Sequence, residues 1–252
     1  MKVRERIKIV VNDAPPEPCL DALKKAGFSF RFELGYVLLD DTFERGRIDR
    51  VRETLLKKGL EFEIFHSVFC EYSKIDFERA DLLFLTFPEI EIPGLTTHTQ
   101  CASCRRTLIA NHVDSIDSEI ETTHAIFSIN GDIDVVNSNV RKAIEASGLR
   151  GIDCSQPVDT IGQYYRLRAT QSPARRVILA EDVINPLPEC SECGRPMYEI
   201  LFGPSRFHRS DCNGMDMIED SLLQIPFYSR KALQFFKKFE RGIKEHEPAY
   251  LQ

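Results

Sequence analysis

The chain of 252 residues contains no tryptophan, no long apolar run and no strong excess of either charge. None of its apolar stretches approaches the roughly 18 to 20 residues that cross a bilayer, so we expect no membrane helix. The first residues include basic side chains but no apolar core followed by a small-residue cleavage site, which argues against a signal peptide. We therefore expect a cytoplasmic protein, in which thiols stay reduced.

Motifs of the common enzyme classes are also missing. We find no GxSxG, Walker A, HExxH or Rossmann glycine pattern. Two acidic pairs are present, the D-x-D pair Asp132 and Asp134 and the adjacent residues Glu181 and Asp182. Such pairs can hold a divalent cation or act as acid and base. Because Asn130-Gly131-Asp132 is a strong turn signal, we interpret these carboxylates as turn or surface groups. We therefore predict that the protein is not an enzyme.

Residues 1–92 are expected to form an N-terminal α/β domain. Alternating apolar and polar residues or β-branched runs predict strands, and apolar residues at helical spacing before Gly27 and Gly59 predict helices. The expected elements are strands at 7–11, 28–34, 36–39, 60–65 and 82–87, and helices at 19–26 and 48–56. They indicate helices packed on a small mixed sheet. Cys19 and Cys70 have no partner at ligand spacing, and we interpret them as buried thiols and His66 as a structural histidine.

The cysteines at two other places have the spacing of metal ligands. The sequence contains Cys101-Ala-Ser-Cys104 and Cys190-Ser-Glu-Cys193. A short CxxC loop directs both sulfur atoms at one ion, and two such loops complete a tetrahedral zinc site. Such a site has no open position for water and is structural. We predict one structural Zn²⁺ bound by Cys101, Cys104, Cys190 and Cys193.

An internal repeat supports the pairing of these two loops. A serine, a helical stretch and a Gly-Ile pair recur at Ser138 and Gly151 and again at Ser229 and Gly242, and a CxxC precedes each copy. We expect residues 93–252 to form a zinc-pinned α+β domain built from two related halves, about 93–180 and 181–252.

A local zinc finger is the main alternative. Cys190 and Cys193 are followed by His208 and Cys212 in a C-x2-C-x14-H-x3-C pattern, which also suits a metal site. Cys101 and Cys104 would then have to find partners such as His98 or His112. A redox-active cysteine pair is a third possibility. We favour the four cysteines of the two CxxC pairs.

Several segments together resemble the double-CXXCG motif proteins, a bacterial family described mainly in myxobacteria and akin to polymorphic-toxin immunity proteins. The resemblance covers roughly residues 93–252. It rests on the first CxxC after Pro93-Gly94-Leu95, on residues 135–151, on Tyr164-Tyr165-Arg166-Leu167, on Pro188–Arg195 with the second CxxC, on Asp216-Met-Ile, and on the stretch that begins at Ser229. The first motif departs from the family, because Arg105 stands where a glycine is expected.

This resemblance implies a zinc-stabilised binding protein of the immunity type, with a bacterial toxin as its protein partner. The alternative is a zinc-knuckle protein that binds nucleic acid, because Arg166, Arg168, Arg175 and Arg176 lie close to two tyrosines. The acidic net charge of −6 makes nucleic acid the less favoured partner. We interpret the arginines at 166 and 168 as the outward residues of an exposed strand.

Overall fold

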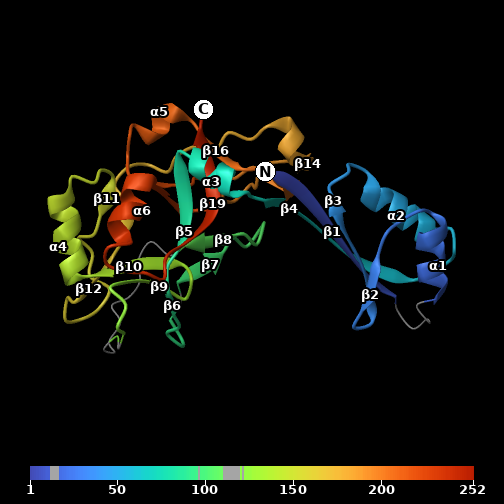
Figure 1. The fold of residues 1–252 in the computed structure, drawn as a ribbon, viewed down its shortest axis with the longest axis horizontal. Helices are drawn as coiled ribbons and strands as arrows, with labels where there is room; N and C mark the ends of the chain where they lie inside the picture. The colour runs from blue at the N-terminus through green and yellow to red at the C-terminus, as the bar shows by residue number, and fades with distance from the viewer. Residues whose placement is uncertain (12–16, 96, 110–119, 121) are drawn as a thin grey trace. The chain divides into compact units, whose positions relative to one another are not determined.

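The computed structural model describes residues 1–11, 17–95, 97–109, 120 and 122–252. They form a mixed α+β protein, as predicted, with two compact units (Figure 1). Unit 1 comprises Met1–Ser73, Ala180–Asn185 and Tyr198–Gly203, and unit 2 comprises Lys74–Leu179, Pro186–Met197 and Pro204–Gln252. The first boundary therefore lies at residue 73 and not near residue 92. The reason is strand β5 (Leu82–Thr86), which pairs with strands from the C-terminal part of the chain.

Unit 1 has a βαββαβ topology. Its elements are β1 (Lys2–Val11), α1 (Glu17–Lys25), β2 (Arg31–Glu33), β3 (Tyr36–Thr42), α2 (Arg47–Leu56) and β4 (Phe62–Glu71). The strands are ordered β2-β3-β1-β4 and all neighbours are antiparallel, which is the ferredoxin-like arrangement. Strand β1 is longer than its β-branched stretch predicts, because it pairs with β4 from Lys2 to Val11.

The core of unit 1 lies between this sheet and the two helices. Ile7 and Ile9 of β1 are fully buried against apolar residues of α1 and α2, including Leu23 and Leu55. Cys19 belongs to the same core, which confirms its interpretation as a buried thiol. Because side chains alternate along a strand, the residues between the core positions of β1 lie on the opposite face of the sheet.

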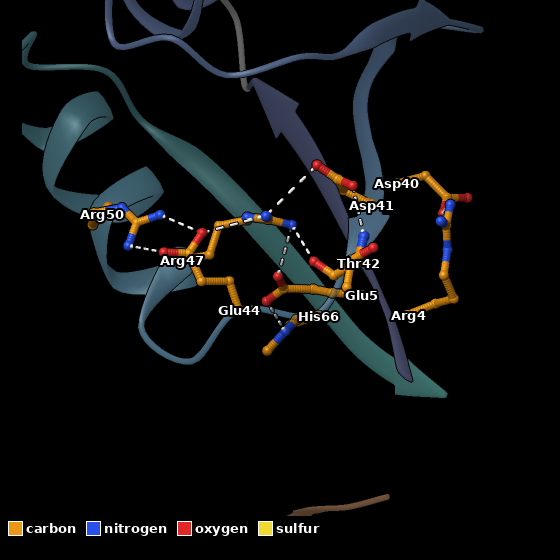
Figure 2. A network of polar contacts seen from close by, with 9 residues as sticks. All are labelled: Arg4, Glu5, Asp40, Asp41, Thr42, Glu44, Arg47, Arg50 and His66. Carbon is orange, nitrogen blue, oxygen red and sulfur yellow. Dashed lines mark hydrogen bonds and ion pairs between the residues drawn. The ribbon is translucent and has the colours of Figure 1, made fainter. Parts of the chain in front are cut away.

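A buried carboxylate interrupts the apolar face of β1 (Figure 2). Glu5 has the same side-chain direction as Ile7, and its side chain is 1% exposed. Its two oxygen atoms contact His66 Nε2 at 2.8 Å and Arg47 Nη1 at 3.3 Å. Arg47 also donates to the backbone oxygen of Thr42 at 2.8 Å. The expected structural role of His66 is therefore a hydrogen bond to a buried carboxylate.

Unit 2 contains two larger sheets. The five-stranded sheet has the order β16-β19-β5-β18-β17, and the four-stranded sheet has the order β12-β10-β9-β6. The strands are β6 (Glu89–Ile90), β9 (Ile126–Ile129), β10 (Ile133–Asn137), β12 (Tyr164–Arg166), β16 (Ser205–Phe207), β17 (Met217–Glu219), β18 (Pro226–Ser229) and β19 (Lys244–Leu251). Residues of both sheets share one apolar core, in which Leu83, Val136 and Tyr228 are buried.

Smaller elements complete the chain. They are α3 (Lys74–Arg79), β7 (His98–Gln100), β8 (Thr107–Ile109), α4 (Ser138–Ser147), β11 (Ile152–Asp153), β13 (Arg168–Ala169), a 3₁₀ turn η1 (Ala180–Asp182), β14 (Val183–Leu187), β15 (Met197–Leu201), α5 (Arg209–Cys212) and α6 (Arg230–Phe236). Strands β7 and β8 pair with each other, and so do β14 and β15. No helix in the described part of the chain is long and apolar enough to cross a membrane.

The sequence repeat corresponds to two similar local structures. In each copy an antiparallel strand pair leads into a helix, and a strand begins at the isoleucine of the Gly-Ile pair or directly after it. Helix α6 is capped by Ser229, whose side chain accepts from Ala232 N at 3.0 Å. Helix α4 is capped by Asn137, whose side chain accepts from Val140 N at 2.9 Å, and not by the serine of the repeat, Ser138. The two copies differ afterwards, because β11 forms a two-stranded sheet with β13 whereas β19 lies between β5 and β16.

Candidate metal centre

Each CxxC occupies a tight loop with the same backbone hydrogen bonds. In the first loop, Arg105 N donates to Cys101 O at 2.8 Å and Cys101 N donates to Arg106 O at 3.0 Å. In the second loop, Gly194 N donates to Cys190 O at 2.8 Å and Cys190 N donates to the oxygen of residue 195 at 3.0 Å. We name residues 101–106 knuckle 1 and residues 190–195 knuckle 2. Both belong to unit 2.

The residue after each second cysteine has a left-handed backbone. Gly194 has φ of 67° and Arg105 has φ of 58°. Glycine adopts this conformation without strain, whereas another residue pays about 1–2 kcal/mol for it. Knuckle 1 keeps both hydrogen bonds, so the missing glycine leaves the shape of the loop unchanged and lowers only its stability.

The fold brings the four sulfur atoms of the two knuckles together. Cys101 Sγ lies 3.7 Å from Cys190 Sγ, and Cys104 Sγ lies 3.8 Å from Cys193 Sγ. The four sulfur atoms all lie within 4.8 Å of one another. A tetrahedron with metal–sulfur bonds of about 2.3 Å has edges of about 3.8 Å. The four cysteines are therefore arranged as the ligands of one ion, and the sulfur atoms are too far apart for a disulfide, whose length is about 2.05 Å.

The electrostatics of the cluster favour a cation at its centre. Backbone amides of Cys193 and Glu192 lower the pKa of Cys190 to about 6. The amide of Cys104 also lowers the pKa of Cys101, but burial and hydrogen bonds to neighbouring thiols outweigh it and raise that pKa to about 12. The two thiols are coupled, so ionisation of one raises the pKa of the other. A divalent cation would replace the thiol protons and allow all four groups to ionise.

Two further contacts connect the knuckles. Glu192 Oε2 accepts from Ser103 N at 2.9 Å and from Cys101 Sγ at 3.4 Å. Arg106 Nη1 donates to the backbone oxygen of Pro196 at 2.6 Å. Sequence reasoning did not identify Glu192 as part of the centre. Its place inside the second CxxC was the available signal, because a residue between two ligand cysteines lies close to both of them in the chain.

The alternative local finger would need His208 and Cys212 beside the second CxxC, and the structure places these two residues in other surroundings. Cys212 is 1% exposed and packs in an apolar cluster with Phe207 and Phe227, and burial raises its pKa to about 11. His208 is the N-cap residue of α5. Within the part of the chain that the structure describes, neither joins the four-sulfur group.

The other candidate ligands have separate environments. His98 Nδ1 contacts Asp132 Oδ2 at 2.7 Å. His112 lies outside the described residues. Cys154 is buried in the core of unit 2.

Two of the four arginines considered for nucleic-acid binding, at positions 166, 168, 175 and 176, form ion pairs with carboxylates. Arg175 forms an ion pair with Asp211 at 2.8 Å, and Arg176 forms one with the fully buried Asp220 at 2.6 Å. The Arg176 pair is buried and belongs to the interior of unit 2, whereas the Arg175 side chain is 70% exposed. The charges of these two arginines are thus partly compensated.

Comparisons of the chain with family models, with curated proteins and with solved structures give no match. The resemblance to the double-CXXCG proteins thus stays an interpretation of the sequence segments that carry it. The four-sulfur geometry stands independently of it.

Proposed function

We propose that Cys101, Cys104, Cys190 and Cys193 bind one structural Zn²⁺. The observation that carries this proposal is the set of sulfur–sulfur distances, 3.7 Å and 3.8 Å between the knuckles. Zinc accepts four thiolates in a tetrahedron, and such closed sites hold a fold together. Bound zinc would supply a positive charge and a link between chain segments, with no coordination position left for a substrate.

Metal content tests this assignment. We expect one zinc per chain in the purified protein, loss of zinc in Cys101→Ser, and full zinc content in Cys212→Ser. Loss of zinc in Cys212→Ser alone would instead support the local finger. Full zinc content in both variants would remove Cys101 from the ligand set. Circular dichroism of both variants controls for folding.

We further propose that the protein works by binding, as a cytoplasmic immunity-type protein that neutralises a cognate bacterial toxin. The resemblance of residues 93–252 supports this proposal, and so does a metal centre that is closed to substrates. An inhibitor acts through a rigid surface that is complementary to its target in shape and charge. The net charge of −6 suits a basic target.

A growth assay tests the proposed partner. The chain is co-expressed with candidate toxins encoded by neighbouring genes, and a toxin that it neutralises should also be retained by the immobilised protein. Rescue of growth together with direct binding supports the proposal. Failure against every neighbouring candidate, with zinc-loaded and folded protein, contradicts it.

Single-stranded nucleic acid is the second candidate partner, and a surface of unit 1 favours it. On the face of the sheet away from the helices, Lys8 Nζ lies 4.2 Å from the ring centre of Tyr36. Arg6 lies 5.4 Å from the ring centre of Phe69 and also pairs with Asp40 at 2.7 Å, so Lys8 is the cation that carries this candidate. Phe65 on the same face is 56% exposed. Sheets that present cations beside aromatic rings bind bases by stacking and phosphates by charge.

Fluorescence anisotropy with a labelled oligonucleotide separates the two candidates. Binding that weakens with salt and in Phe65→Ala would support nucleic acid as the partner. Absence of binding at 50 mM salt would leave the toxin as the proposed partner.

A further inference from the structure

The four cysteines of the metal centre differ in their exposure to solvent. Cys101 and Cys190 are buried, with 2% and 3% of their surface exposed, whereas Cys104 and Cys193 are partly exposed. Cys104 Sγ and Cys193 Sγ lie 3.8 Å apart and come from different knuckles. Each knuckle thus contributes one inner and one outer cysteine, and the sulfur atoms of the two outer cysteines are neighbours.

The two knuckles are held against each other by contacts that do not use the sulfur atoms. Arg106 Nη1 donates to Pro196 O at 2.6 Å, and Ser103 N donates to Glu192 Oε2 at 2.9 Å. Backbone hydrogen bonds inside each knuckle fix the shape of its loop. The sulfur atoms of the outer cysteines are therefore kept close together by the protein itself, with or without an ion between them.

Exposure and proximity decide which thiols an oxidant converts into a disulfide. The oxidant must reach one sulfur, and a second thiol must lie near enough to react with the first product. The outer cysteines meet both conditions, whereas the inner cysteines are shielded from solvent. Cys70 of β4 is also partly exposed but does not belong to the four-sulfur group, and the other three cysteines of the chain are buried. The pair Cys104 and Cys193 is thus the place where oxidation can join two thiols.

We propose that Cys104 and Cys193 are a site of reversible oxidation by hydrogen peroxide, which joins the two knuckles by a disulfide when the metal has left. The inference rests on the proposed metal centre, because the disulfide takes over the link that the ion provides. It also assigns different roles to cysteines that the CxxC spacing makes equivalent. The inner cysteines serve only as ligands, and the outer cysteines serve as ligands and as the oxidisable pair.

The reaction consumes one peroxide for each disulfide. One outer sulfur, as its thiolate, attacks a peroxide oxygen, the O–O bond breaks, and a sulfenic acid forms while the second oxygen leaves as water. The other outer thiolate then attacks the sulfenic sulfur, so that the S–S bond forms, the S–O bond breaks, and the departing hydroxide takes up a proton. In total, two thiols lose two electrons and two protons, and one hydrogen peroxide becomes two water molecules.

The disulfide preserves the long-range connection of the metal centre. Cys104 and Cys193 are 89 positions apart, and the loop that the ion closes between Cys104 and Cys190 spans 86 positions. Because the entropy of loop closure depends only weakly on loop length, the two links restrict the unfolded chain to a similar extent. Accessible disulfides are readily reopened by thiols, so reduction restores all four ligands.

Peptide mapping of the full chain tests the proposal. The purified protein, with its zinc content measured, is treated with hydrogen peroxide in the presence of a chelator, remaining thiols are alkylated, and linked peptides are identified by mass spectrometry. We expect one disulfide, between Cys104 and Cys193, and its loss after treatment with dithiothreitol. The chelator without peroxide should leave all eight thiols free. A disulfide within either knuckle, or none at a peroxide concentration that oxidises glutathione, would overturn the proposal.

Variants and urea unfolding give a second readout. Cys70→Ser should form the disulfide as wild type does, whereas Cys193→Ser should form none in unit 2. After chelation, oxidised wild type should unfold at a urea midpoint at least about 1 M above that of reduced wild type. Equal midpoints would contradict the claim that the disulfide replaces the link. Zinc content before oxidation tests the metal centre and the mapped disulfide tests the oxidation site, so the two can fail separately.

Discussion

The metal centre makes a quantitative prediction about the stability of unit 2. Zinc bound by both knuckles closes a loop between Cys104 and Cys190, which are 86 positions apart. Closing a loop of that length with a cross-link lowers the entropy of the unfolded chain by the equivalent of about 4.6 kcal/mol at 25 °C. Removal of the ion should therefore cost unit 2 about 4 to 5 kcal/mol, and more if the sulfur atoms are left buried without a cation.

Urea unfolding followed by circular dichroism measures this cost, since the chain has no tryptophan for fluorescence. With a slope of about 2–3 kcal/mol per M, the unfolding midpoint of unit 2 should fall by roughly 2 M after chelation. Cys193→Ser should start from the lower midpoint and respond little to the chelator, which separates metal removal from other effects of chelation. An unchanged midpoint in wild type that has verifiably lost its zinc would refute the idea that the ion connects the two knuckles.

Four other substitutions test parts of the structure by urea unfolding. Arg105→Gly should stabilise the zinc-loaded protein by about 1 kcal/mol, and Gly194→Ala should destabilise it by a similar amount, because both positions have positive φ. A change of the same sign in the unfolding free energy of both variants would contradict this account. Glu5→Gln should cost unit 1 about 3 kcal/mol, since it leaves Arg47 and His66 without their buried anion; a cost below about 1 kcal/mol would show that the network is not stabilising. Asp134→Asn should stabilise unit 2 at pH 7 by up to about 3 kcal/mol and have little effect below pH 4. The reason is that the pKa of Asp134 in the folded protein, about 6, lies above the ordinary value of an aspartate. The wild type therefore loses stability as the pH rises between about 4 and 6, whereas the variant does not. The same unfolding series at pH 4, 5, 6 and 7 checks it, and a gain that is independent of pH would be inconsistent with a raised pKa.

Local sequence patterns were sufficient for much of unit 1. The helices expected at 19–26 and 48–56 match α1 and α2 to within about two residues. Their prediction rests on the spacing of apolar residues and on the glycines that follow, and both are local features of the sequence. The strand expected at 28–34 is much shorter, with three residues in β2. Alternation alone cannot set the length of a strand, since the neighbouring strand must be present to pair with it.

For the metal centre, the sequence predicted the four ligands but not the contacts around them. CxxC spacing indicates a ligand pair, and the repeat indicated that the two pairs belong together. The structure adds the left-handed backbone of Arg105 and the contacts of Glu192, which depend on how one knuckle faces the other. The D-x-D pair appeared to be a turn signal, and only the packing of the two sheets places it beside Arg166 and Arg168.

The sequence by itself determined the α+β class, the helices of unit 1 and the two cysteine pairs, because each depends on residues a few positions apart. The tertiary structure alone decided that β5 joins unit 2, that four sulfur atoms lie within 4.8 Å of one another, and that an acidic pair lines a hollow with two arginines. These features join residues tens of positions apart. Their energies come from burial and pairing across the fold, which no local pattern specifies.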